Sequence, residues 1–191
     1  MDIIGDHTPA AAGRPKMPSM PKIPRSQNRT PSWRLRMNGS PHLRVTSPGI
    51  AEDERFLLTH TGRGDDVSPE LRINGLTDDV ARLAVVLTDE THPLLGSMTH
   101  WLIWNLPAQS VIEAGLPSGR ITRDGAVQGR GYGLHRYRGP KPPRGTSHRY
   151  SFLVLALDAP LSCPARAGTR RFWRSAAGHI LQWGVLEGVF E

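Results

Sequence analysis

The run Leu83-Ala-Val-Val-Leu-Thr-Asp89 decides the fold of this chain, because it is almost entirely apolar and ends in an acid. Its lack of alternation predicts a central β-strand that is covered on both faces. A second run, His100-Trp-Leu-Ile-Trp-Asn105, begins with a histidine, and His148-Arg-Tyr150 opens a third run, which continues to Leu157. Side chains two residues apart share one face of a strand, so His148 and Tyr150 should point the same way. These strands are therefore expected to bring polar groups to one place, a candidate pocket.

The rest of the chain consists mostly of short strand candidates separated by turn residues. Within the second run, alternation predicts that Trp101, Ile103 and Asn105 face one way and that Leu102, Trp104 and Leu106 face the other. Residues 108–147 are rich in Gly, Pro and Arg, and a loop of that length in a compact domain is usually functional or partly flexible.

A helical pattern appears only near the end of the sequence. Phe172, Ala176 and Ile180 recur every four residues, Gly184 is the expected stop, and alternation over 185–189 predicts a closing strand. The sequence thus predicts a mainly β fold, an antiparallel β-sandwich with one C-terminal helix.

Composition limits the classes of function. The 24 Lys and Arg residues against 17 Asp and Glu give a formal net charge of +7, which permits attraction to nucleic acid or to an anionic membrane. Without a basic helix in the pattern, nucleic-acid binding is not expected. The single Cys163 excludes an internal disulfide and a Cys-rich zinc site, and fits a reducing compartment. No apolar run approaches the length of a transmembrane helix and no signal peptide is recognisable, so we expect a cytoplasmic protein without transmembrane insertion.

Residues 1–31 differ from the remainder of the chain. They contain many prolines, more basic than acidic residues and few large apolar side chains, so we expect a disordered, Pro-rich basic tail, with the domain at 32–191. Pro15, Pro18, Pro21 and Pro24 recur every third residue, which is the repeat of a polyproline II helix and is compatible with a docking peptide. A solvated extension without a partner is the alternative.

An ordered set of motifs resembles the phosphatidylethanolamine-binding proteins, in particular their bacterial, Raf-kinase-inhibitor-like branch. The set spans about residues 55–190 and comprises Asp66-Val-Ser-Pro69, the strand into Thr88-Asp89, residues 100–105, the loop Tyr137-x-Gly-Pro-x-Pro-Pro-x-Gly145, His148-Arg-Tyr150 and Gly178-His-Ile-Leu. The order of the motifs is more specific than any one of them. The family usually reads Asp-Pro-Asp-x-Pro where this chain reads Asp89-Glu-Thr-His-Pro93, so Thr91 replaces the second acid, and anions should be repelled less than in a typical member.

The resemblance implies a β-sandwich with a small pocket for phosphate-like head groups and other anions. The matching positions here are Asp89, His100, Gly139, Pro140, Pro142, Pro143, His148 and Tyr150. A carboxylate near an imidazole favours its charged form, so both histidines could donate N–H bonds to an anion. Tyr150 adds a hydroxyl donor, Gly139 permits close backbone approach, and the prolines supply rigid walls.

The expected function is therefore a non-catalytic binding or regulatory protein without a cofactor, whose ligand is a small anion or a phospholipid head group. A hydrolase of phosphate or ester substrates with a pocket histidine as base is the first alternative, although no nucleophile with its own base is evident. A protein inhibitor with a vestigial pocket is the second, with a kinase or a protease as partner by analogy. A zinc site at the two histidines and Asp89 is a minor alternative, and a homodimer stays open.

Overall fold

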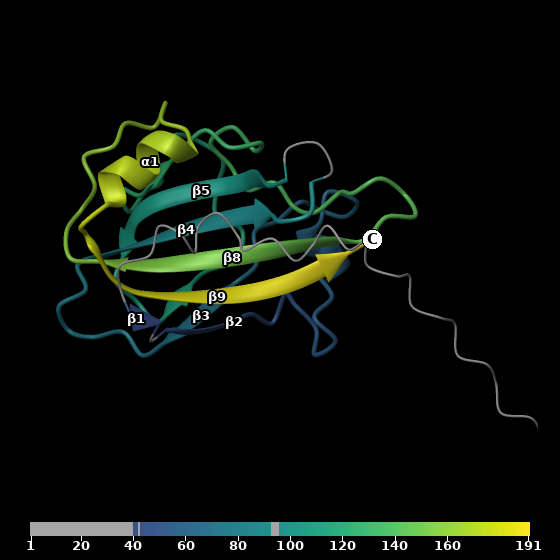
Figure 1. Ribbon diagram of the computed structural model, residues 1–191, viewed down its shortest axis with the longest axis horizontal. Helices are drawn as coiled ribbons and strands as arrows, with labels where there is room; N and C mark the ends of the chain where they lie inside the picture. Colours follow the sequence, from purple (N-terminus) through teal and green to yellow (C-terminus); the bar gives the residue numbers. More distant parts are fainter. Residues whose placement is uncertain (1–39, 42, 93–95) are drawn as a thin grey trace, which may run out of the picture.

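The computed structural model describes residues 40–41, 43–92 and 96–191, and in this part of the chain the regular structure is mostly β (Figure 1). Six strands form one sheet in the order β1-β9-β8-β4-β5-β7, and three form a second sheet in the order β2-β3-β6. The strands are β1 (Ser40–Pro41), β2 (Arg44–Thr46), β3 (Leu71–Asn74), β4 (Arg82–Asp89), β5 (Met98–Pro107), β6 (Val111–Ile112), β7 (Val127–Gln128), β8 (His148–Leu157) and β9 (Ile180–Phe190). The helical elements among the described residues are one 3-10 turn, η3 (Leu58–His60), and one α-helix, α1 (Thr169–Ala176). The predicted tail at 1–31 lies outside the described residues.

The centre of the larger sheet is β4, which pairs antiparallel with β5 on one side and with β8 on the other. Every residue of β4 after Arg82 is buried. Because side chains alternate along a strand, Leu83 and Val85 enter one apolar core while Ala84 and Val86 enter another. The predicted central strand, covered on both faces, is confirmed.

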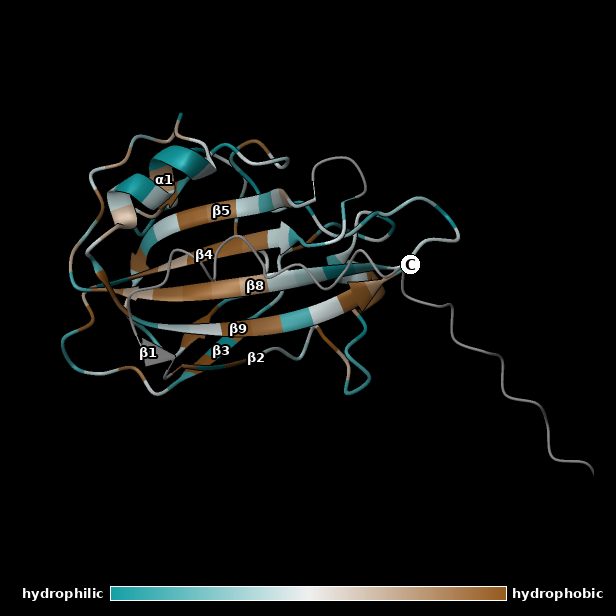
Figure 2. Ribbon diagram, viewed as in Figure 1, coloured by the Kyte–Doolittle hydropathy of each residue, from teal (hydrophilic) through white to brown (hydrophobic). Residues whose placement is uncertain are grey.

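The two cores give the molecule three layers. One core lies between the two sheets and includes Ile73 of β3 and Phe152 of β8. The other lies beneath α1 and includes Phe172 and Trp104, whose ring centroids are 5.7 Å apart. Figure 2 shows the long strands largely hydrophobic and much of α1 hydrophilic. The predicted β-sandwich with one helix near the C-terminus is confirmed, and no helix among the described residues is long and apolar enough to cross a membrane.

The end of the predicted helix was wrong. The helix stops at Ala176, Gly178 turns with a φ of 84°, and Ile180 already belongs to β9. Gly184 is therefore no helix stop. It lies within β9 against the main chain of Leu43, where a Cβ would collide with the Leu43 carbonyl oxygen. The four-residue spacing placed Ile180 in the helix because one apolar residue fits either period.

The predicted faces of β5 hold as far as Trp104 and fail at Leu106. Asn105 has a φ of 61°, and the register with β4 shifts there, so that Leu83 pairs with Leu106 while Ala84 pairs with Trp104. This bulge turns Leu106 into the core that contains Trp101. The Asn105 side chain donates to the Leu161 carbonyl and accepts from the Leu161 N–H, which stabilises the unusual backbone.

Residues 108–147 are more ordered than the sequence suggested, because they contain β6 and β7. Buried Gln128 organises this segment. Its side-chain oxygen accepts from Trp101 Nε1 at 2.8 Å, and its amide nitrogen donates to the carbonyls of Pro117 and Gly119. The loop is thereby fixed to the edge of the larger sheet.

Candidate functional site

Four of the predicted residues come together at one end of the larger sheet. Asp89 is the last residue of β4 and pairs in register with Tyr150 of β8. His148 begins β8, and its ring stacks beside that of Tyr150 with centroids 6.4 Å apart. His100 reaches the same place through a second bulge: Leu87 pairs with Trp101 and Thr88 with Thr99, so His100 is the extra residue of β5. Its ring lies edge-on to Tyr150 at 5.3 Å.

Asp89 and His148 form a buried hydrogen-bonded pair. His148 Nδ1 lies 2.7 Å from Asp89 Oδ2, and both residues are buried. The other carboxylate oxygen accepts from the N–H of Thr91 at 2.8 Å and from its hydroxyl at 3.0 Å. The Thr91 hydroxyl also accepts from the N–H of Arg149 at 3.1 Å. Thr91 stands where the family usually has a second acid, so the site carries one negative charge less. In addition, Thr91 orients the carboxylate of Asp89.

His100 has a different environment from His148. Its Nδ1 lies 2.9 Å from the carbonyl of Arg138, which only accepts, so Nδ1 carries the proton. Burial lowers the pKa of His100, although its hydrogen bond to Arg138 and the nearby Asp89 charge oppose that shift. This direction is opposite to the sequence-based expectation of an imidazolium. Its Nε2 is buried without a hydrogen-bond partner in the described protein.

Tyr150 retains its proton. Burial raises the pKa of its hydroxyl far above the ordinary value, and the Asp89 charge acts in the same direction, while a hydrogen bond from the main chain of Lys141 and the charge of Arg63 oppose it. The cluster therefore combines one hydroxyl donor, one bare imidazole acceptor and one imidazole held by a carboxylate. Such a set can bind an anion that also carries a proton.

The loop that contains Gly139 and Pro140 is anchored by an acid that the sequence reasoning did not single out. Asp66 accepts from the N–H of Gly139 at 2.6 Å and from Arg138 Nη1 at 3.0 Å. The Tyr137 hydroxyl donates to the carbonyl of His60 at 2.6 Å. A Cβ on Gly139 would collide with that same carbonyl oxygen, so glycine is required by space here. The signal for Asp66 was available in the Asp66-Val-Ser-Pro69 motif, which contributed to the family resemblance but did not lead us to assign Asp66 a role.

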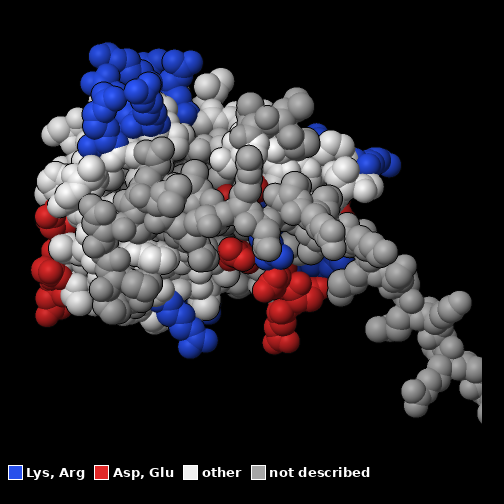
Figure 3. Space-filling model, viewed as in Figure 1, with Lys and Arg blue, Asp and Glu red and all other residues white. Residues whose placement is uncertain are grey.

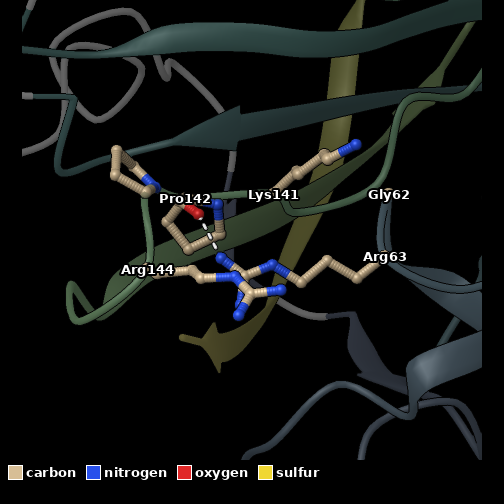
Figure 4. A pocket seen from close by; sticks show the side chains of 6 residues that line it. Gly62, Arg63, Lys141, Pro142 and Arg144 are labelled. Atoms are coloured by element: carbon tan, nitrogen blue, oxygen red, sulfur yellow. Dashed lines mark hydrogen bonds between the residues drawn. The ribbon is translucent and has the colours of Figure 1, made fainter.

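Pro142 and Pro143 line an open depression of about 640 Å³ together with Gly62, Arg63, Lys141 and Arg144. In Figure 4 the guanidinium groups of Arg63 and Arg144 extend toward one another. Arg63 Nη2 donates to the Pro142 carbonyl at 2.5 Å, whereas Lys141 and Arg144 have no ion-pair partner in the described protein. This basic depression adjoins the cluster through Lys141, and composition alone did not locate it.

Comparison of the sequence with known proteins identifies a family and several relatives. The family model for phosphatidylethanolamine-binding proteins matches residues 46–191. The chain is 38% identical over 153 residues to UPF0098 protein PH1269 of Pyrococcus horikoshii, covering 78% of this chain and 76% of that protein. It is 35% identical over 157 residues to a UPF0098 protein of Pyrococcus abyssi, covering 80% and 88%.

Two solved structures share the fold. Escherichia coli YbcL, described as a new member of the mammalian PEBP family, superposes with a TM-score of 0.69 at 25% identity, covering 78% of this chain and 98% of that one. A phosphatidylethanolamine-binding protein homologue of Chlamydia trachomatis gives a TM-score of 0.68 at 24% identity, covering 80% and 99%. Fold and cluster define the class, a β-sandwich with a polar site at one end of its larger sheet. Within this class, the chain belongs to the phosphatidylethanolamine-binding protein family.

Proposed function

We propose that this protein is a non-catalytic binding and regulatory protein that takes a small phosphate or a phosphate-bearing head group at Asp89, His100, His148 and Tyr150. The observation that carries the proposal is the bare Nε2 of His100, a buried acceptor without a partner in the described protein. A buried polar atom that makes no hydrogen bond costs stability, and a ligand that supplies the bond would remove this cost.

The ligand must donate as well as accept. Neutral His100 offers a lone pair at Nε2, which a hydrogen phosphate or a protonated phosphomonoester can satisfy with its O–H. The Tyr150 hydroxyl can donate to another oxygen of the same group. Arg63 acts electrostatically on Tyr150 and shares its depression with Lys141 and Arg144, so positive charge on this side of the cluster favours an anion. Sulfate carries no proton at neutral pH and should be a poor ligand.

A hydrolase remains the second candidate, because a carboxylate that orients a histidine is also the arrangement of a general base. In the described part of the chain, the His148 ring has no hydrogen-bond partner other than Asp89, so no serine or threonine hydroxyl is activated by it. Burial raises the pKa of the Cys163 thiol, which makes it a weak nucleophile. Binding without turnover is therefore the better-supported function.

Calorimetric titration with phosphate and with sulfate at neutral pH tests the proposal. Wild type should bind phosphate more tightly than sulfate, and His100→Ala should remove this difference. His179→Ala is a matched control, because His179 is an exposed histidine paired with Asp158. Failure of wild type to bind either anion would reject the site. Turnover of a phosphomonoester or carboxylester that His100→Ala abolishes would favour the hydrolase.

A further inference from the structure

The outer surface of α1 carries a cluster of arginines that the proposed function does not use. Arg170, Arg171 and Arg174 on the helix and Arg166 just before it are all exposed. Arg130 joins them, because its main chain forms a bridge with Gly168 at the start of the helix. We call these five arginines the α1 arginine face. Figure 3 shows a compact, raised group of blue side chains over the position of α1. The expectation that the chain contains no basic helix was thus wrong.

None of the five has an ion-pair partner in the described protein. Other arginines are neutralised: Arg55, Arg72 and Arg149 each contact a carboxylate within 4 Å. The α1 arginine face therefore concentrates much of the unpaired positive charge of the described domain at one place.

The helix itself is electrostatically unfavourable as it stands. The positive end of a helix dipole lies at its N-terminus and favours acids, yet the first turn contains no acidic residue and carries Arg170 and Arg171. Gly168 gives no side-chain cap. An external anionic partner would relieve this repulsion. The opposite side of the helix is rigidly placed, because Phe172 and Trp173 are buried in the core beneath it.

The shape of the face selects the partner. A site for single-stranded nucleic acid combines a basic groove with exposed aromatic rings, whereas Trp173 is only 8% exposed and the arginines stand up from the surface. A helix of eight residues is about 12 Å long, too short to track along a nucleic-acid backbone. Three arginines on the exposed side of α1, together with Arg166 and Arg130 beside the helix, form a raised basic cluster that fits a flat anionic surface.

We propose that the α1 arginine face docks this protein onto the surface of an anionic lipid bilayer, without insertion of any segment. The attachment is electrostatic, since the apolar side of α1 is occupied by the core. It is independent of ligand binding at His100 and His148. Each arginine near such a surface should strengthen binding roughly fivefold, and salt should weaken it.

Sedimentation with vesicles tests the proposal. Wild type should bind vesicles of phosphatidylcholine mixed with phosphatidylserine and should not bind pure phosphatidylcholine. The variant Arg170→Gln/Arg171→Gln/Arg174→Gln should bind on the order of 100-fold more weakly. Arg44→Gln/Arg72→Gln/Arg82→Gln removes the same charge from exposed positions on β2, β3 and β4 and should bind like wild type. Thermal melts establish that both variants are folded.

Three results would overturn the proposal. Wild type that does not sediment with phosphatidylserine vesicles would remove the bilayer as partner. Equal losses in the two triple variants would show attraction by net charge alone. Tighter binding to an oligonucleotide than to the vesicles at the same salt concentration would assign the face to nucleic acid.

Discussion

His148 Nδ1 and Asp89 Oδ2 lie 2.7 Å apart at the end of the larger sheet, with side chains 10% and 3% exposed. Removing one member of a buried pair leaves the other without its partner, which is costly. Asp89→Ala should therefore destabilise the fold by about 3–5 kcal/mol. A double-mutant cycle with His148→Ala, measured by urea unfolding, should give a coupling of about 1–3 kcal/mol. Strictly additive effects would mean that the pair contributes nothing to stability.

Thr91 should matter through its hydroxyl. That group donates to Asp89 Oδ1 and accepts from the N–H of Arg149. Thr91→Val keeps the shape and loses both bonds, so it should cost about 1–3 kcal/mol. Thr91→Ser keeps the hydroxyl and is the control. If both substitutions had the same small effect in denaturant titration, Thr91 would only fill space.

His100 should make stability depend on pH. Its pKa is lowered in the folded protein from the ordinary 6.5, so the unfolded chain binds the proton more readily. Stability from the neutral ring is present above pH 6.5 and is lost as pH falls through the lower folded pKa. His100→Asn can still donate to the Arg138 carbonyl but does not titrate. As the pH decreases below 6.5, the melting temperature of the His100→Asn variant should fall less than that of wild type. Parallel curves for the two proteins would contradict a neutral, buried His100.

Residues 1–31 are proposed to be dispensable for folding, because their composition offers no core to bury. A chain that starts at residue 32 should melt within about a degree of the full chain, because segments without buried contacts add little stability. Differential scanning calorimetry of the two chains makes the comparison. A drop of many degrees would show that the tail packs on the domain and that the boundary at residue 31 is misplaced.

The sequence could predict whatever depends on the regular period of a strand. The run from Leu83 to Asp89 is apolar without alternation, and this predicted a central strand covered on both faces. Because side chains alternate along a strand, the two-residue spacing placed His148 and Tyr150 on one face. The motif order was enough to predict the family and the sandwich. The sites where that period fails could not be predicted from the sequence. Asn105 and His100 are bulged residues, and a bulge depends on how two strands pair, which no local pattern encodes.

The tertiary structure alone decided the chemistry of the cluster and the distribution of charge. Whether His100 is charged depends on its burial and on its hydrogen bond to the carbonyl of Arg138, which lies 38 positions away in the chain. The hydrogen bond from Gly139 N–H to Asp66 forms only because the fold brings two loops into contact. Every arginine carries the same charge in the sequence, but only the fold determines that Arg149 contacts a carboxylate, whereas Arg170 and Arg171 contact none among the described residues. Spacing along the chain therefore fixed the strands, and contacts between distant segments fixed the protonation and the exposed charge, because desolvation and ion pairing depend on distance in space.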